Sequence, residues 1–457
     1  MHDRSRLVNR LRSGLGAQGV KQAVNVFVRL AEVPLLLSFW GTARYGEWLM
    51  VAAIPAYLAM ADGGFTGAAQ REMTIRKGGD DQKGALAVFQ STWVLLLILS
   101  VGMMGLAAVI TNTTPLASWL HFTSISNSEL SAIVLLLTGQ VVLGFQCGLI
   151  YGGYSCEGEY GRGTFIVAAM YLLDFLGMGA AIVMGAGPVG AAAGLAVGRA
   201  MGLVVFLIDL PRVAPWLRFG WSHASSARVM SLVRPSMASM AFPLGRALNI
   251  QGMRLVVGLV LGPSAVAVFS SIRTLCRSAL KPVLIVAELV EPEMALAFGS
   301  GRLADMRDML KRSSQVTLWM AVPACAVLWF IGAPLLNIWT TGRIELDVQL
   351  YALLLLASVA HSIWFSALMV SYATNRHGRA AVVFLAANLG LLVATAVLVD
   401  HIGIAGAGLA IALFEVVMVA WILPEAFMLS GERFVGWASL VARPPLFLVK
   451  SVMAKRT

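Results

Sequence analysis

Long apolar runs recur along the whole chain, about one every 35 residues, and polar residues fall mainly between them. Each run is long enough to cross about 30 Å of hydrocarbon as an α-helix. The pattern predicts twelve membrane spans, at 18–40, 45–68, 86–111, 130–152, 164–184, 190–211, 231–258, 265–290, 316–338, 349–372, 381–399 and 405–428. We therefore expect an all-α polytopic membrane protein.

An internal repeat divides these spans into two halves. Glycine-rich turns precede spans 6 and 12, with Gly190 and Gly406 lying 216 positions apart, and the same two spans contain Leu210-Pro211 and Leu423-Pro424. A period near half the chain predicts two pseudo-symmetric six-helix lobes around a central cavity, a common plan for transporters. The expected parts are an N-terminal lobe at 1–229 with a basic N-terminus and an inter-lobe loop at 212–229, a C-terminal lobe at 230–428 and a basic tail at 429–457.

Composition agrees with a membrane protein and gives its orientation. Mean hydropathy is +0.80 and only 12% of residues are charged, whereas about 25% is usual in soluble domains. With the N-terminus in the cytoplasm, the predicted inside segments hold 25 of the 34 Lys and Arg residues, and the outside loops hold only Arg44 and Arg343. This bias predicts that both termini are cytoplasmic. It also explains the net charge of +11 without a nucleic-acid partner.

Several kinds of chemistry have no signal in the sequence. The four cysteines lack metal-ligand or CxxC spacing, and there is no phosphate-binding GxxxxGK[ST] motif and no HExxH motif. No stretch between spans is large enough for an ATP-binding domain. We therefore expect no metal, no cofactor and no catalytic residue, and interpret the chain as a secondary transporter and not an enzyme.

Seven basic residues remain inside the spans, and six of them fall on spans 1, 7 and 8: Arg29, Arg246, Arg254, Arg273, Arg277 and Lys281. In span 8, Arg273, Arg277 and Lys281 recur every four residues, which places them within about 80° of arc on one helix face. Each charge in hydrocarbon costs about 2.5 to 3.5 kcal/mol, so this cluster needs water, counter-charge or an anionic ligand.

Uncharged polar residues follow the same spans. Gln22, Asn25, Arg29 and Glu32 form a polar seam along one face of span 1, and Asn249 lies in span 7. Because helices turn such seams away from lipid, we expect Gln22, Asn25 and Asn249 to line a shared polar cavity.

Four carboxylates inside the spans are candidates for binding a coupling ion: Glu32, Asp62, Asp174 and Glu415. Each also has a structural interpretation. Asp174 and Arg199 lie near mid-membrane on consecutive spans, which favours an ion pair. Asp62 precedes Gly63-Gly64, which favours a turn residue. His361 is the lone histidine of span 10 and is better explained as a satisfied polar contact than as a proton relay.

Short motifs along the chain resemble those of a known family. Tyr45-Gly46-Glu47-Trp48, Asp62-Gly63-Gly64, the Gly262-Pro263 turn and Ala373-Thr374-Asn375-Arg376-His377-Gly378 resemble polysaccharide-type lipid flippases. These are O-antigen and exopolysaccharide exporters of the multidrug/oligosaccharidyl-lipid/polysaccharide (MOP) superfamily. Arg254 departs from the resemblance, because the family pattern before the turn favours an acidic residue.

The resemblance implies a bacterial inner-membrane flippase with a cationic central cavity. Its substrate is then an undecaprenyl-diphosphate-linked oligosaccharide, moved from the cytoplasmic to the periplasmic leaflet by alternating access. Membrane lipids and other polysaccharide-assembly membrane proteins are the partners that it implies. Arginine matches phosphate oxygens bidentately, so the in-span arginines are expected to receive the diphosphate.

Two other functions stay open at this point. One is a MATE-like drug or cation antiporter of the same superfamily, although a cation carrier needs inward-facing carboxylates more than arginines. The other is a membrane glycan polymerase or ligase. Such an enzyme is expected to have long outside loops with catalytic groups, whereas the longest outside loop here, at about 112–129, has one acidic residue and one histidine.

Overall fold

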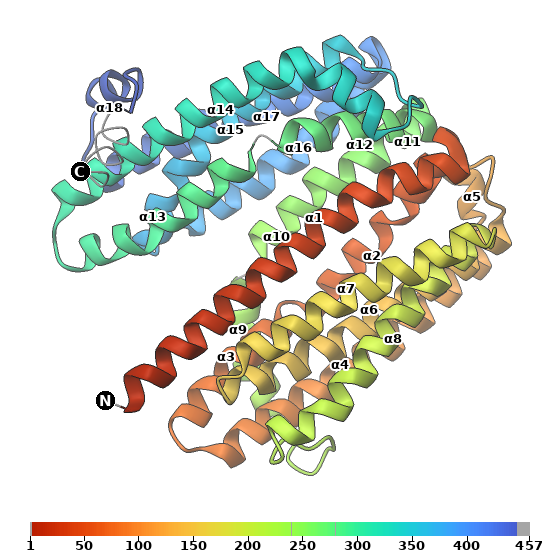
Figure 1. The fold of residues 1–457 in the computed structure, drawn as a ribbon, viewed down its shortest axis with the longest axis vertical. Helices are drawn as coiled ribbons and strands as arrows, with labels where there is room; N and C mark the ends of the chain where they lie inside the picture. The colour runs from red at the N-terminus through yellow and green to blue at the C-terminus, as the bar shows by residue number, and fades with distance from the viewer. Residues whose placement is uncertain (1, 239, 279, 446–457) are drawn as a thin grey trace. The chain divides into compact units, whose positions relative to one another are not determined.

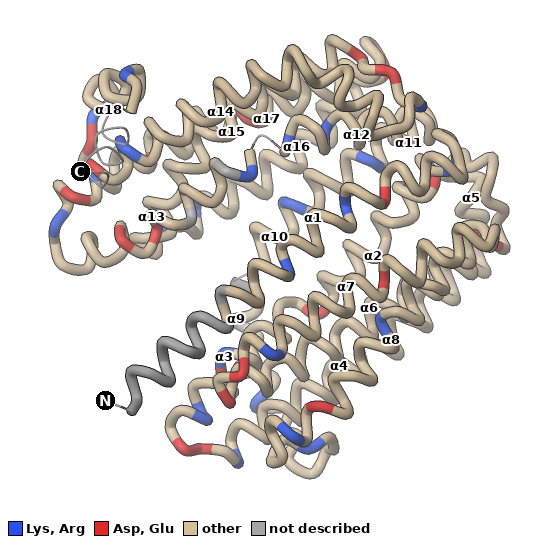
Figure 2. Tube along the Cα trace, in the orientation of Figure 1, with Lys and Arg blue, Asp and Glu red and all other residues tan. Residues whose placement is uncertain are grey.

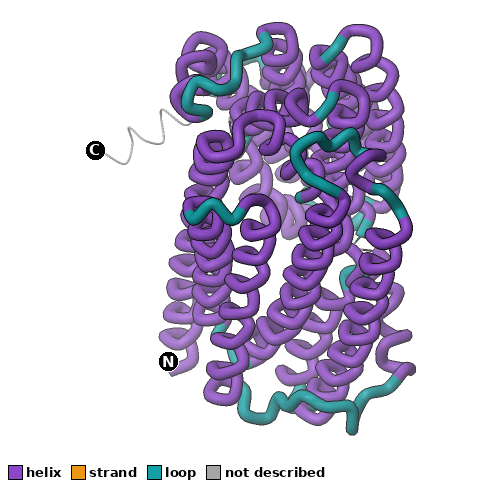
Figure 3. The backbone as a smooth tube through the Cα atoms, turned by 90° about the vertical axis from the view of Figure 1, so that its right-hand side faces the viewer, coloured by secondary structure: helices purple, strands orange, loops and turns teal. Residues whose placement is uncertain are grey.

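The computed structural model describes residues 2–238, 240–278 and 280–445, and these residues form helices joined by short loops, with no strand among them (Figure 3). The chain divides into two compact units, residues 1–247 and 248–457, so that the division falls inside predicted span 7. Each unit is described here by itself. In the described part of the chain, ten helical stretches are long and apolar enough to cross a membrane.

Unit 1 contains eleven helical elements (Figure 1). They are α1 (His2–Val51), α2 (Ala53–Leu58), η1 (Ala59–Asp62), α3 (Phe65–Gly78), α4 (Gln82–Thr113), α5 (Leu116–Trp119), α6 (Asn127–Cys156), α7 (Tyr160–Val183), α8 (Gly187–Val213), α9 (Ser226–Ala238) and α10 (Ala241–Ala247).

The described residues of unit 2 form nine helical elements. They are η2 (Leu248–Gly252, a π-helix), α11 (Met253–Leu261), α12 (Pro263–Ser278), α13 (Lys281–Gly299), α14 (Leu303–Trp339), α15 (Val348–Ala373), α16 (Gly378–Ile402), α17 (Ile404–Ser430) and α18 (Phe434–Val441).

Glycines bring α7 and α8 unusually close together in unit 1, and the two helices run side by side in Figure 1. A Cβ atom on Gly198 would lie 2.6 Å from the Asp174 Cα atom, and one on Gly194 would collide with the Gly177 carbonyl. Only glycine permits such backbone contact, which is a common means of helix association in membranes. This contact fixes the register between the two helices that carry Asp174 and Arg199.

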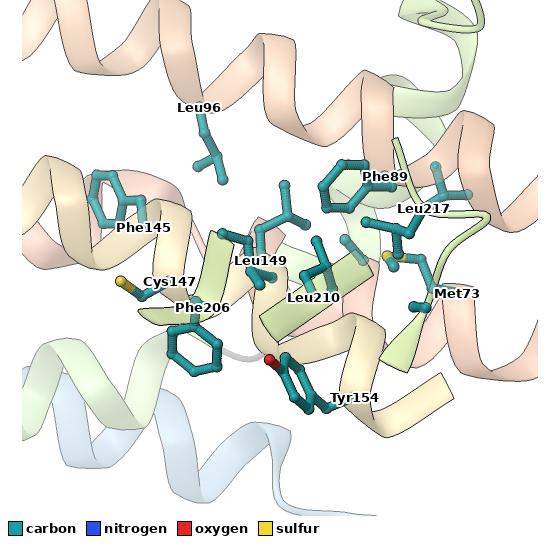
Figure 4. Close-up of a cluster of buried hydrophobic side chains, with 14 of the residues drawn as sticks. Met73, Phe89, Leu96, Phe145, Cys147, Leu149, Tyr154, Phe206, Leu210 and Leu217 are labelled. Atoms are coloured by element: carbon teal, nitrogen blue, oxygen red, sulfur yellow. The ribbon is translucent and has the colours of Figure 1, made fainter. Parts of the chain in front are cut away.

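A cluster of buried apolar side chains packs several helices of unit 1 together (Figure 4). It joins α3, α4, α6, α8 and the segment that follows α8, and includes Met73, Phe89, Leu149, Tyr154 and Leu217. Several charged residues of this unit lie where α3 meets α4 (Figure 2). There Arg76 pairs with Glu72 and Asp81, and Lys77 pairs with Glu157.

The first predicted loop and the second predicted span differ from the structure. Only Gly41, with φ 70° and ψ −177°, interrupts α1, so the first two predicted spans form one continuous stretch, Gly16–Asp62. Predicted span 45–68 is itself broken into the end of α1, α2 and η1, and it ends at Gly63 and Gly64, both with positive φ. Glycine adopts such left-handed conformations at little cost, so the break follows from local sequence.

Predicted span 265–290 is also not one helix. Helix α12 ends at Ser278, and α13 begins at Lys281 with Pro282 in its first turn. Proline lacks the amide hydrogen that a continuing helix requires but suits the first turn of a new one. These two differences account for the ten stretches found where twelve spans were predicted.

The two halves of the predicted repeat begin in the same way. Gly187, with φ 66°, begins α8, and Gly403, with φ 64°, precedes α17. Both helices are 27 residues long and contain a proline near their ends, Pro211 and Pro424. In unit 2, α17 packs against α15 and α16, as α8 packs against α6 and α7 in unit 1.

Candidate functional site

Two neighbouring cavities open within unit 1, with volumes of about 240 and 470 Å³. Asn25, Glu32, Tyr171 and Asp174 line the first, Asp62 and Arg199 line the second, and the Gln140 side chain borders both. Helix α1, the broken segment after it, α6, α7 and α8 supply these residues. Part of the polar seam predicted along span 1 therefore borders an internal polar space within its own unit.

Asp174 and Arg199 form a buried ion pair between α7 and α8, as predicted. The Arg199 Nε atom lies 3.1 Å from Asp174 Oδ2, and the two side chains, Arg199 and Asp174, are 16% and 8% exposed. The guanidinium also lies 5.7 Å from the Tyr171 ring, and Gly144 faces it without a side chain. The pair brings opposite charges into direct contact, so that each neutralises the other.

The other site residues predicted in unit 1 are more exposed to solvent than this ion pair. Asp62 acts as a turn residue, as predicted, because its Oδ1 accepts a hydrogen bond of 2.8 Å from the Gly64 amide. Glu32 and Asn25 are half-buried at the cavity wall, and Gln22 and Arg29 are exposed. Arg246 is exposed on α10, at the end of the unit.

Arg273 is the most buried of the predicted cationic residues, with 7% of its surface exposed. Its Nη1 donates a hydrogen bond of 2.8 Å to the Asn249 carbonyl and its Nη2 donates to Asn249 Oδ1. The Asn249 amide donates at 2.8 Å to Asn388 Oδ1, whose own amide donates to the Phe384 carbonyl. The guanidinium also lies 5.5 Å from the Phe269 ring. Arg273 is thus held by neutral acceptors and an aromatic face, so its positive charge is not cancelled locally.

Asn249 occupies an irregular piece of helix. It lies in η2, the π-helical turn that joins α10 to α11, and π-helical turns of this kind recur at functional sites. Its backbone carbonyl and its side chain both face Arg273. The predicted polar face of span 7 and the predicted cationic face of span 8 therefore meet at this pair.

Arg254, Arg277 and Glu415 lie close enough to Arg273 to act on its charge. Arg254 donates a hydrogen bond of 3.0 Å to Gln251, and both Arg254 and Arg277 are half-buried. Lys281 is exposed and begins α13. The expected stripe of three cations on one continuous helix is therefore wrong at Lys281, because the helix is interrupted before it.

Glu415 is buried on α17 and is held by the side chains of His361 and Trp364. His361 Nδ1 lies 3.1 Å from both carboxylate oxygens, and the Trp364 indole donates to Oε2. The His361 ring also stacks on Phe365. As predicted, His361 is a satisfied polar contact, and its partner is one of the candidate coupling carboxylates.

The sequence motifs include Glu47 but do not predict its role as a fully buried carboxylate of α1. Its Oε1 accepts hydrogen bonds from the backbone amides of Thr123 and Ser124, at 2.6 and 2.8 Å, and thereby fixes the loop before α6. A lone carboxylate within the apolar run 45–60 was the available signal. Asn388, a single amide within the apolar α16, was a similar signal.

No group of three or more His, Cys, Asp or Glu residues suited to a metal ion occurs among the described residues. The four cysteines are unpaired and three of them, Cys147, Cys276 and Cys325, are buried. The chemistry of these sites is therefore that of guanidinium, carboxylate, imidazole and amide groups.

The chain matches no family model and no curated protein, but its fold is similar to that of several solved structures. An inward-facing multidrug resistance MATE family transporter of the MOP superfamily matches with a TM-score of 0.75 and 14% identity, over 90% of this chain and 98% of that chain. The inward closed conformation of the lipid II flippase MurJ matches with a TM-score of 0.69 and 12% identity, over 96% and 93%. An outward-facing conformation of a MATE family transporter matches with a TM-score of 0.64 and 15% identity, over 92% and 96%.

These identities are low, so the comparisons show the fold. The chain has the same multi-helix membrane fold as these MATE and MurJ structures, a fold with about 12 transmembrane helices in two lobes. That result confirms the fold class predicted from the apolar runs.

Proposed function

We propose that this protein is a flippase that moves an undecaprenyl-diphosphate-linked oligosaccharide from the cytoplasmic to the periplasmic leaflet of a bacterial inner membrane. The observation that carries the proposal is the group of Arg254, Arg273 and Arg277 in unit 2, where Arg273 is buried without a carboxylate partner among the described residues. The charge of Arg273, held by neutral hydrogen-bond acceptors, suits an anionic ligand nearby. The resemblance of one solved neighbour, a lipid II flippase, points to the same class of substrate.

The three arginines have different roles in this proposal. Arg273 has both terminal nitrogens engaged by Asn249, so it acts as a fixed source of positive potential. Arg254 and Arg277 are half-buried and can present guanidinium groups to phosphate oxygens. Lys281, which is exposed, is the further cation of unit 2 in this proposal. Asn249 serves this proposal by positioning Arg273, because its side-chain oxygen and nitrogen are engaged by Arg273 and Asn388.

The membrane potential can drive this export. Moving about two negative charges outward across a potential of about 100 mV, inside negative, releases roughly 4.6 kcal/mol. A coupling ion is a second source of energy. Of the four carboxylates proposed for it, Asp174 is neutralised by Arg199, which leaves Glu32, Asp62 and the Glu415–His361 pair.

A specific observation favours a second candidate, a MATE-like antiporter of cationic drugs. The cavities of unit 1 are bordered by three carboxylates, those of Glu32, Asp62 and Asp174, and by one arginine, Arg199. Carboxylates that border a polar cavity suit a cation or a proton. The MATE structures of the same fold agree with this alternative.

Translocation in proteoliposomes tests the proposal. A fluorescent prenyl-diphosphate oligosaccharide is reconstituted with wild type and with Arg254→Gln plus Arg277→Gln, with and without an imposed potential. We expect the double variant to lose about tenfold or more of its rate, since two charge-assisted contacts to phosphate are removed. Arg307→Gln, outside the predicted spans of unit 2, is the control and should transport at the wild-type rate.

The results separate the two candidates. Wild-type rates in the double variant would overturn the assignment of the diphosphate to these arginines. Transport of a cationic dye by the wild type, without transport of any prenyl-linked glycan, would establish the antiporter instead. An inside-negative potential should accelerate outward movement of the diphosphate, and no response to potential would remove it as the driving force.

A further inference from the structure

A groove of about 590 Å³ lies between α7 and α8 in unit 1, away from the cavities described above. It is formed where α7 begins and α8 ends, at the end of the unit that the distribution of Lys and Arg predicts to face the cytoplasm. Its walls include Glu159, Arg162, Phe165, Ile208, Asp209 and Arg212. The groove thus combines an apolar part with two acidic and two basic side chains.

The apolar part faces outward from the unit. The Phe165 and Ile208 side chains are 47% and 59% exposed, although they lie on helices apolar enough to cross a membrane. In a bilayer such a surface is covered by acyl chains. Glu159, Arg162 and Arg212 stand about one to two turns nearer the helix ends, where lipid headgroups lie.

Two of the four charged residues of the groove pair with each other. Arg162 forms an ion pair with Asp209, whose second oxygen accepts a hydrogen bond of 2.9 Å from the Tyr154 hydroxyl. Asp209 is largely buried and Arg162 is half-exposed, so the pair fixes the guanidinium at the groove wall. It contributes structure and no net charge.

The other two charges face the groove from opposite helices. Glu159 is the N-cap residue of α7 and Arg212 lies in the last turn of α8. Within the described residues, neither takes part in an ion pair, and Arg212 has only a weak contact of 3.3 Å with the Ile208 carbonyl. The groove therefore offers one anionic and one cationic group to a ligand that carries an acyl chain.

We propose that this groove binds an aminophospholipid of the phosphatidylethanolamine class. Its phosphate pairs with Arg212 beside Arg162, its primary ammonium donates to the Glu159 carboxylate, and an acyl chain lies along Phe165 and Ile208. A headgroup with both charges matches the groove, whereas an anionic phosphatidylglycerol would leave Glu159 facing negative charge. The quaternary ammonium of phosphatidylcholine has no N–H to donate to a carboxylate.

Native mass spectrometry of the purified full chain tests the proposal. The protein in detergent is titrated with phosphatidylethanolamine, phosphatidylcholine and phosphatidylglycerol that carry identical acyl chains. We expect wild type to retain the ethanolamine lipid about fivefold more than either of the others, the ratio that about 1 kcal/mol of headgroup electrostatics produces.

Variants of Glu159 and Arg212 test which part of the lipid headgroup each residue binds. Glu159→Gln should abolish the preference for ethanolamine over choline, and Arg212→Gln should weaken binding of all three lipids. Asp80→Asn and Arg218→Gln change exposed charges of the same unit that lie outside the groove, and both should bind as wild type.

Two results would overturn the proposal. One is equal or tighter binding of phosphatidylglycerol by the wild type, which needs no variant and so stays decisive if a variant fails to fold. The other is an unchanged preference in a folded Glu159→Gln protein. Because the readout is binding and not translocation, the outcome is independent of which substrate the protein transports.

Discussion

The two units bury charge in opposite ways. Unit 1 sets Arg199 against Asp174 across α7 and α8, so that a cation and an anion satisfy each other directly. Unit 2 keeps its buried cation and anion apart: Arg273 is held by the amide and carbonyl of Asn249, and Glu415 is held by His361 and Trp364. Arg199 and Glu415 nonetheless lie the same number of residues after the glycines that begin α8 and α17.

The difference has an electrostatic consequence. A direct ion pair has little field beyond itself, whereas a charge held by neutral dipoles keeps its potential in a medium of low dielectric constant. Unit 1 is therefore built for stability at this point, and unit 2 retains charge that a ligand or a proton can use. The ligand proposed for unit 2 follows from this contrast.

The largest effect is expected from breaking the pair in unit 1. Asp174→Asn leaves Arg199 buried without a counter-charge, which should lower the free energy of unfolding by about 3 to 5 kcal/mol. Chemical unfolding in mixed micelles measures the loss. Adding Arg199→Met to the same chain should recover most of it, and a double variant as unstable as Asp174→Asn would show that the charges do not act as a pair.

A smaller loss is expected from the matching change in unit 2. Asn249→Ala removes one acceptor of Arg273 and keeps the backbone carbonyl, so the cost should be about 1.5 to 3 kcal/mol, the usual contribution of a hydrogen bond to a charged group. The same measurement in Asn388→Ala and in the double variant gives the coupling between the two amides. A loss as large as that of Asp174→Asn would remove the contrast between the units.

Much of this fold follows from sequence because hydrocarbon imposes one strong requirement, that backbone polar groups be satisfied within each span. Apolar length therefore predicts where helices run, and the pairing of Asp174 with Arg199 follows because they are opposite charges on consecutive spans. The breaks were predicted less well. Gly41 and Lys281-Pro282 lie in apolar surroundings, and hydropathy does not distinguish a kink from a loop.

The partners of buried polar groups were the least predictable part. Helical periodicity assigns Arg273 to a face, but whether that face meets Asn249, water or a carboxylate depends on how α11, α12 and α16 pack. Glu47 shows the same limit, because its partners lie in a loop more than 70 residues away. A lone polar residue in an apolar run indicates that such a contact exists, but it does not identify the residue that makes the contact.

A third change separates hydrogen bonding from charge in unit 2. Glu415→Gln can keep its contacts, since its amide can donate to His361 Nδ1 and its carbonyl can accept from Trp364. We expect a loss of about 1 kcal/mol or less in unfolding free energy. A loss near that of Asn249→Ala would mean that the negative charge itself, acting on Arg273, stabilises the unit.

The smallest effect is expected where both units use the same device at the surface. Asp81 caps α4 by accepting from the Gly84 amide, and Asp347 caps α15 by accepting from the Leu350 amide, each at 2.8 Å. Asparagine caps a helix about as well as aspartate, so Asp81→Asn and Asp347→Asn keep the caps. Asp81 also pairs with Arg76, so only its variant loses an exposed ion pair, and we expect its Tm to fall by about one degree or less.

The pH dependence of that small effect has a definite sign. The Gly84 amide, followed by Arg76, stabilises the ionised form and lowers the pKa of Asp81 below its ordinary value. The contribution of Asp81 is therefore present above the ordinary carboxyl pKa, and it is lost as the pH falls through the lowered value in the folded protein. Thermal unfolding of wild type and Asp81→Asn should differ at neutral pH and converge in acid. A difference that grows in acid would contradict the assignment and would mean that Asp81 is stabilised in its protonated form.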